Sequence, residues 1–135
     1  MREIESNLES VCHQPLEPTA KITAWFLALH RAKVTKVLHD PELYKAFDLS
    51  TAVQKPFAAE HMKILRRQLI ALVKEALAAR GLHEGYDPEA LAEVLSEALM
   101  AFHHPKLVAQ SIHEDREPLL LRVLDSVLGG FQLKP

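Results

Sequence analysis

The 135-residue sequence predicts an all-α fold, a single antiparallel helical bundle. Apolar residues recur at intervals of three and four along most of the chain, which is the spacing of one helix face. No segment shows the sustained alternation of apolar and polar residues that marks a strand. The chain is rich in Ala and Leu and has only four glycines, a composition that favours helices. Its length corresponds to one domain, taken here as residues 1–135.

The first helices are separated by prolines. Residues 3–13 are expected to form a short helix, or the end of a longer one, and Pro15 and Pro18 interrupt it. A long helix is predicted over 19–39. The apolar sides of these two helices comprise Ile4, Leu8 and Val11 in the first, and Ile22, Trp25, Phe26, Leu29, Val34, Val37 and Leu38 in the second.

Cap residues predict where the next helices begin and end. Asp40 and Pro41 suit the N-cap and first position of a short helix that reaches Phe47. A third long helix is predicted over 55–80, and Gly81 is expected to end it in a left-handed C-cap. The apolar side of this helix is expected to carry Met62, Leu65, Leu69, Leu72 and Ala76.

The C-terminal third repeats the cap chemistry. Asp87 and Pro88 are expected to open a helix over 88–102. A short turn of helix follows Pro105. The last helix is predicted from near Asp115 to Gly129–Gly130, with Pro118 in its first turn. The adjacent His103 and His104 point about 100° apart on a helix, so they cannot serve one site. Because the residue before a proline disfavours helical geometry, this pair is predicted to end the helix rather than to bind a metal.

The last two helices are apolar over too much of their circumference for a single core-facing stripe. Residues 119–131 place apolar side chains around roughly half the helix, whereas about 100° suffices for one core contact. A helix central in a monomeric bundle would explain this width. The preferred interpretation is a symmetric homodimer that pairs residues 88–102 and 117–131 of each subunit. The expected contact residues are Leu91, Leu95, Leu99, Phe102, Leu120, Leu124, Val127 and Leu128.

Several classes of function are disfavoured. A net charge of −2 without a run of Lys or Arg gives no basic footprint for nucleic acid or membrane surfaces. The sequence shows no signal peptide and no transmembrane stretch. The lone Cys12 cannot form an intrachain disulfide, which is typical of a reducing compartment. We therefore expect the protein to be located in the cytoplasm. No nucleophile elbow, phosphate loop or Glu-x-x-His pair is present. The sequence therefore predicts no enzyme, no catalytic residues, no metal site and no cofactor.

Two isolated histidines lie on apolar helix faces. His30 falls between Phe26 and Val34, and His61 is followed at seven-residue spacing by Gln68. Such a residue is often a core histidine bonded to the backbone, and that interpretation stays open, as does a core role for the neighbouring aromatic residues. The alternative is a mainly apolar pocket with a few orienting polar groups. Its expected ligand-binding residues are Trp25, Phe26, His30, Phe57, His61, Met62 and Leu65.

The order of these elements resembles the C-terminal, effector-binding and dimerisation domain of the TetR family of transcriptional regulators. The stretches that carry the resemblance are RAKVTKVLHDPELYKAF (31–47), LVKEALAARGLHEGYDPEALAEVLSEALMAFHHPKLV (72–108) and LLLRVLDSVLGGF (119–131). The match rests on order and spacing and extends over essentially the whole chain.

The resemblance implies a sensor of a small, mainly apolar effector, bound within the bundle and coupled to a homodimer. Residues 1–14 would be the end of the helix that links to an upstream DNA-binding domain. The chain has no counterpart of that helix-turn-helix domain, so contact with DNA is expected only through it, and repression is the family's usual mode. The alternative function is a stand-alone helical protein-interaction module without a ligand.

Overall fold

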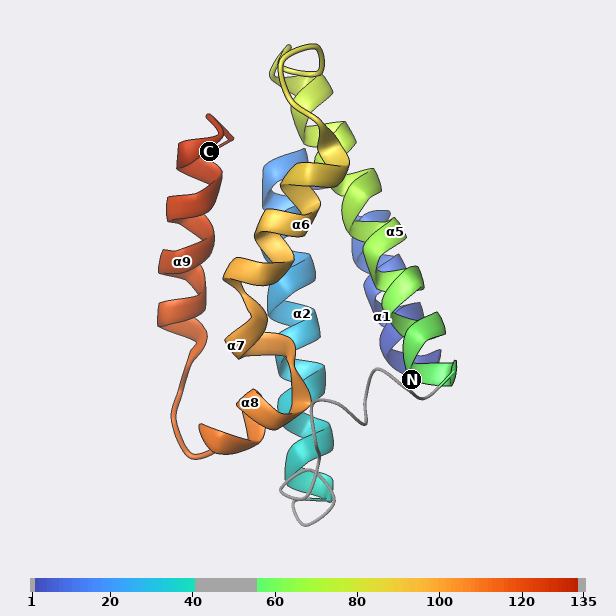
Figure 1. The fold of residues 1–135 in the computed structure, drawn as a ribbon, viewed down its shortest axis with the longest axis vertical. Helices are drawn as coiled ribbons and strands as arrows, with labels where there is room; N and C mark the ends of the chain where they lie inside the picture. Colours follow the sequence, from blue (N-terminus) through green and yellow to red (C-terminus); the bar gives the residue numbers. More distant parts are fainter. Residues whose placement is uncertain (1, 41–55, 134–135) are drawn as a thin grey trace.

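The computed structural model describes residues 2–40 and 56–133. For residue 2 and residues 56–58 it describes the backbone but not the side chains. The described residues form helices and contain no strand, so the predicted all-α fold is confirmed. Successive long helices run in opposite directions, with α2 in the middle of the bundle (Figure 1). The predicted short helix through Phe47 lies outside the described residues.

Helices α1 (Arg2–Cys12) and α2 (Pro18–His39) pack against each other. The predicted apolar side of α1, which comprises Ile4, Leu8 and Val11, is buried. The predicted face of α2 is buried at Ile22, Trp25, Phe26, Leu29 and Val37 and half-buried at Val34, but Leu38 is exposed. Leu38 is one residue beyond Val37, about 100° around the helix, and the helix ends at the next residue, so no packed surface remains for it.

Helix α5 (Pro56–Ala79) lies against both α1 and α2 and runs antiparallel to α2 (Figure 1). Gly81 ends it with a φ of 68°, as predicted. The N–H of Leu82 donates to the carbonyl oxygen of Leu77 at 2.8 Å, which satisfies one of the free carbonyl groups at the helix end.

The predicted helix over 88–102 is divided at Leu99 into α6 (Pro88–Ala98) and α7 (Met100–His103). The N-cap prediction for Asp87 is confirmed, because its side chain accepts from the N–H of Glu89 at 3.0 Å. His104 has extended geometry and separates α7 from α8 (Pro105–Gln110), so the predicted helix end is confirmed. Its ring Nδ1 also accepts from the N–H of Lys106 and caps α8.

Helix α9 (Glu117–Gly130) closes the bundle with Pro118 in its first turn, as predicted. It runs antiparallel to α6 and packs against both α6 and α2 (Figure 1). The core is continuous through all the long helices. Between α6 and α9 it consists of Leu91, Leu95, Leu99, Leu120, Leu124 and Leu128.

Candidate functional site

The aromatic residues predicted to line a pocket lie in the packed core. Trp25 and Phe26 on α2 are almost fully buried, and their rings make an edge contact with centroids 4.9 Å apart. Leu65 on α5 belongs to the same hydrophobic cluster. Both α2 and α5 therefore contribute predicted pocket residues to the core cluster.

His30 makes the backbone contact that is typical of a core histidine. It is 5% exposed, and its Nδ1 lies 2.8 Å from the carbonyl oxygen of Phe102. The two rings also meet edge to face, with centroids 6.0 Å apart. His30 thus holds α7 against α2.

His61 instead joins side chains from three helices. It is 3% exposed. Its Nδ1 lies 2.9 Å from a carboxylate oxygen of Glu5 on α1, and its Nε2 lies 3.4 Å from the ammonium nitrogen of Lys33 on α2. Since the ammonium group can only donate, Nε2 accepts and Nδ1–H donates to Glu5. Burial lowers the pKa of His61, although the hydrogen bond to Glu5 acts in the opposite direction.

Gln68 extends this set of contacts to Trp25. Its side-chain oxygen accepts from the indole N–H of Trp25 at 3.0 Å, and its amide group donates to the backbone oxygen of Glu5 at 3.2 Å. We call Glu5, Lys33, His61 and Gln68 the polar core. It connects the predicted ligand-binding helices α2 and α5 to α1.

Lys33 is the cation of the polar core. Burial, assisted by the nearby charge of Lys36, lowers its pKa to about 8. Its charge also acts on the imidazoles of His103 and His104, whose pKa values are lowered first by burial and then further by this charge. In the described residues no carboxylate lies within ion-pair distance of Lys33. A largely buried cation 3.4 Å from one imidazole is therefore left without a counter-ion there.

The sequence interpretation found His61 and Gln68 but missed Lys33 and Glu5. A signal for Lys33 was present, because Phe26, His30 and Lys33 follow the spacing of one helix face. The long aliphatic stem of lysine allows it to occupy such a position while its amine reaches a polar group. Glu5 has no comparable signal, since it lies beside the apolar face of α1.

The remaining two predicted pocket residues are Met62 and Phe57. Met62 is 55% exposed, so its assignment to the buried apolar side of α5 is wrong, and its role in ligand binding stays a prediction. Helix α6 packs against α5 and then diverges toward α2 and α9 (Figure 1). The side chain of Phe57 lies outside the described residues.

The predicted dimer contacts lie mostly inside the subunit. Seven of the eight residues are at most 3% exposed, and only Val127 is half-buried. The seven form the contact between α6, α7 and α9 and the rest of the core, so they have no surface left for a partner. A partner surface on these helices has to use their outward side, where Val94 and Leu119 are exposed.

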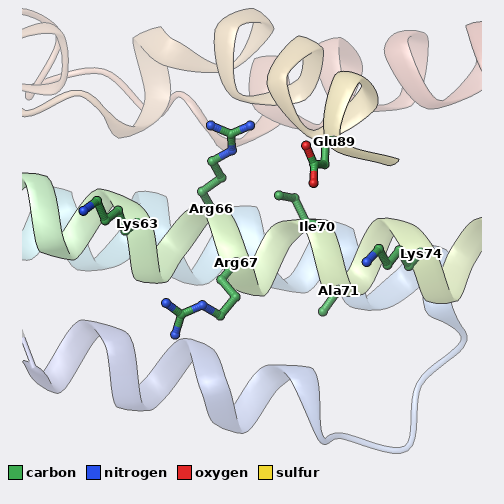
Figure 2. Close-up of a pocket in the computed structure, with 7 residues that line it drawn as sticks. All are labelled: Lys63, Arg66, Arg67, Ile70, Ala71, Lys74 and Glu89. Carbon is green, nitrogen blue, oxygen red and sulfur yellow. The ribbon is translucent and has the colours of Figure 1, made fainter. Parts of the chain in front are cut away.

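Two surface cavities are lined by other residues. The larger, of about 460 Å³, lies along α5 and is drawn in Figure 2. Its lining comprises Lys63, Arg66, Arg67, Ile70, Ala71, Lys74 and Glu89. A second, of about 310 Å³, is lined by Thr23, Leu121, Arg122, Asp125 and Leu128. None of the predicted pocket residues whose side chains the structure describes lines either cavity.

The described part of the chain has neither a metal-ligand cluster nor a helix suited to span a membrane. Within residues 2–40 and 56–133, no three His, Cys, Asp or Glu side chains are grouped as they would be around a metal ion. Each helix described there is too short or too polar to cross a membrane.

Comparison with known proteins gives one match. The family model described as "Tetracyclin repressor-like, C-terminal domain" matches residues 18–123, from the start of α2 into α9. No curated protein and no solved structure matches the chain.

Proposed function

We propose a function from one premise: the chain belongs to the family of tetracycline-repressor-like C-terminal domains. The family is one of transcriptional regulators. The proposed function is the effector-sensing and dimerisation domain of such a regulator, working in the cytoplasm and most commonly as part of a repressor. DNA would be bound by a helix-turn-helix domain upstream of α1.

The polar core is the observation that carries this proposal. Glu5 bonds to His61 through its carboxylate and to Gln68 through its backbone oxygen, so α1 is held by side chains of α5. If α1 links to an upstream domain, a ligand that displaces His61 or Gln68 alters the position of that link. Binding would thereby shift the population between two arrangements of the paired upstream domains.

The proposed effector is mainly apolar and carries one acidic group. Trp25, Phe26 and Leu65 supply apolar walls, and Lys33 supplies a cation that lacks a carboxylate among the described residues. An anionic group next to Lys33 would compensate a charge that burial now disfavours. Since neither surface cavity reaches these residues, entry of the ligand requires side chains of α2 and α5 to move apart.

A thermal-shift screen tests this proposal with a library of apolar carboxylic acids, each paired with its methyl ester. A ligand at 100 times its dissociation constant adds about 2.7 kcal/mol to the free energy of unfolding. We expect an acid to stabilise the wild type more than its ester does, and this difference to disappear in Lys33→Met. Equal effects of acid and ester would remove the acidic group from the proposal, and no stabilisation by any compound would contradict effector binding itself.

For the homodimer we propose the outward side of α6 and α9. Leu119, Val123 and Val127 follow each other at four-residue spacing along α9, and they are exposed or half-buried. Val94 adds an exposed apolar side chain on α6. A two-fold axis beside these helices would bury this surface in a four-helix contact.

A protein-interaction module without a ligand is the second candidate. The core position of Trp25 and Phe26 and the exposed side chains of Val94 and Leu119 favour it. In that case the screen gives no stabilisation, and the outward side of α6 and α9 binds a different protein. Sedimentation that shows a monomer at all concentrations, together with an unsuccessful screen, would support this alternative.

A further inference from the structure

The outer face of α5 carries a row of cations along an open groove. Lys63, Arg66, Arg67 and Lys74 are all exposed and line the cavity of about 460 Å³. We call these four residues with Ile70 and Ala71 the α5 groove. Its volume is within the range of about 300–1,000 Å³ that is usual for sites of small molecules.

The cations of the α5 groove are not held in ion pairs as Lys21 and Arg31 are. Lys21 on α2 lies 2.9 Å from a carboxylate oxygen of Glu75, and Arg31 lies 2.7 Å from one of Glu117. In the described part of the chain, none of the four groove cations has such an ion pair. One carboxylate, that of Glu89 at the start of α6, lines the groove with them. The groove therefore has a local excess of positive charge in a chain whose net charge is −2.

The four cations are spread along the helix rather than gathered around one point. Figure 2 shows Arg66 extending toward the side of α6 and Arg67 toward the side of α1, with Lys63 and Lys74 near opposite ends. The eleven residue steps from Lys63 to Lys74 correspond to about 17 Å of helix. This arrangement suits an elongated molecule with several negative charges better than a single small ion.

We propose that the α5 groove binds a multiply charged anion of the phosphate class. The planar guanidinium groups of Arg66 and Arg67 match phosphate oxygens in paired hydrogen bonds, and the two lysines add point charges farther along. The occupant is either a free polyphosphate or the phosphate backbone of a nucleic acid. This inference does not depend on the proposed effector or on the dimer.

The apolar part of the α5 groove disfavours an acidic protein as the occupant. Protein interfaces depend on a few large side chains that fill well-packed pockets. Here the surface between the cations is formed by Ile70 and Ala71 alone, which offers little for such an anchor. A chain of phosphates needs no apolar anchor, since its affinity comes mainly from charge.

Binding assays with three probes test the proposal: inorganic tripolyphosphate by calorimetry, and a labelled 20-nucleotide single-stranded DNA and labelled polyglutamate by fluorescence anisotropy. The variant is R66E/R67E. The control is R80E/R122E, which makes the same change in net charge at two exposed arginines outside the α5 groove. Circular dichroism checks that both variants remain helical.

We expect tripolyphosphate or DNA to bind at low salt, with an affinity that falls as salt rises. R66E/R67E should weaken that binding by at least about tenfold, since both paired arginine contacts are lost, whereas the control should change it much less. Binding of tripolyphosphate identifies a free polyphosphate as a sufficient ligand, and binding of DNA alone identifies the backbone of a nucleic acid. Binding of neither, an equal loss in the control, or polyglutamate binding as tightly as the phosphates would overturn the proposal.

Discussion

The ammonium nitrogen of Lys33 on α2 lies 3.4 Å from Nε2 of the buried His61 on α5. The opposite nitrogen of the same ring bonds to Glu5 on α1. One imidazole thus separates a cation from a carboxylate and holds three helices together. Burial lowers the pKa of both Lys33 and His61. The free energy of unfolding should therefore depend on pH through both groups.

Lys33 should make the protein more stable as the pH rises from about 8 toward 10.5. Its pKa in the folded state is about 8, against 10.5 for the ordinary side chain. Between these values the unfolded chain binds more protons than the folded one, so the free energy of unfolding increases with pH. The full difference corresponds to at most about 3 kcal/mol. Urea unfolding at pH 7.5, 9 and 10 measures it.

Lys33→Met is the matched variant for this experiment. It keeps an unbranched chain of similar length but removes the charge, so the part of the pH dependence due to Lys33 should be lost. At pH 7 it should also be more stable than the wild type, because the cost of burying an uncompensated ammonium is removed. If the free energy of unfolding changes with pH in the same way in the wild type and in Lys33→Met, Lys33 is well solvated in the folded protein.

Acid should destabilise the protein through its buried histidines. Burial lowers the pKa of His61 and of His103 below the usual 6.5. A lowered pKa in the folded state gives stability that is fully present above pH 6.5 and is lost as the pH falls below it. We expect the urea midpoint to fall between pH 6.5 and 5. The fall should be smaller in His103→Gln but unchanged in His13→Gln, whose ring is 75% exposed.

Substitution by alanine should lower the free energy of unfolding at Gly81 but not at Gly130. Gly81 has a φ of 68°, so Gly81→Ala should lower the free energy of unfolding by about 1 kcal/mol even though no atom lies within 4 Å of the added carbon. Gly130 closes α9 without a positive φ and also has open space. Gly130→Ala should therefore be neutral or add up to about 1 kcal/mol. Equal losses in both variants would show that the two positions do not differ in backbone strain.

The sequence predicted those parts of the fold that depend on neighbouring residues. The N-cap at Asp87 and the C-cap at Gly81 each involve atoms within a few positions of the chain, and local chemistry is sufficient to identify them. Helical periodicity likewise located the buried side of α1. It did not reveal the interruption at Leu99, because an apolar stripe continues through a short break without a change of spacing.

The candidate site was less predictable because it depends on which helices meet. Met62 has the spacing of a core residue but is 55% exposed. Lys33 was overlooked because a charged residue on an inward face contradicts the simple pattern, and only the packing of α2 on α5 shows that its amine reaches His61. Periodicity also cannot distinguish a residue that faces the subunit's own core from one that faces a partner. For this reason the predicted dimer contacts fell on the inward side of α6 and α9.

The proposed dimer can be tested with two neighbouring leucines of nearly equal exposure. Leu119 and Leu121 are 41% and 40% exposed, but Leu121 lines the small cavity that also includes Thr23 of α2, whereas Leu119 continues the row of Val123 and Val127. Leu119→Glu would place a charge in the proposed contact, where burial without a partner is costly. We expect it to raise the dimer dissociation constant at least about tenfold in sedimentation velocity, while Leu121→Glu leaves it nearly unchanged. A dimer that persists in Leu119→Glu but dissociates in Leu121→Glu would move the two-fold axis to the α2 side of α9.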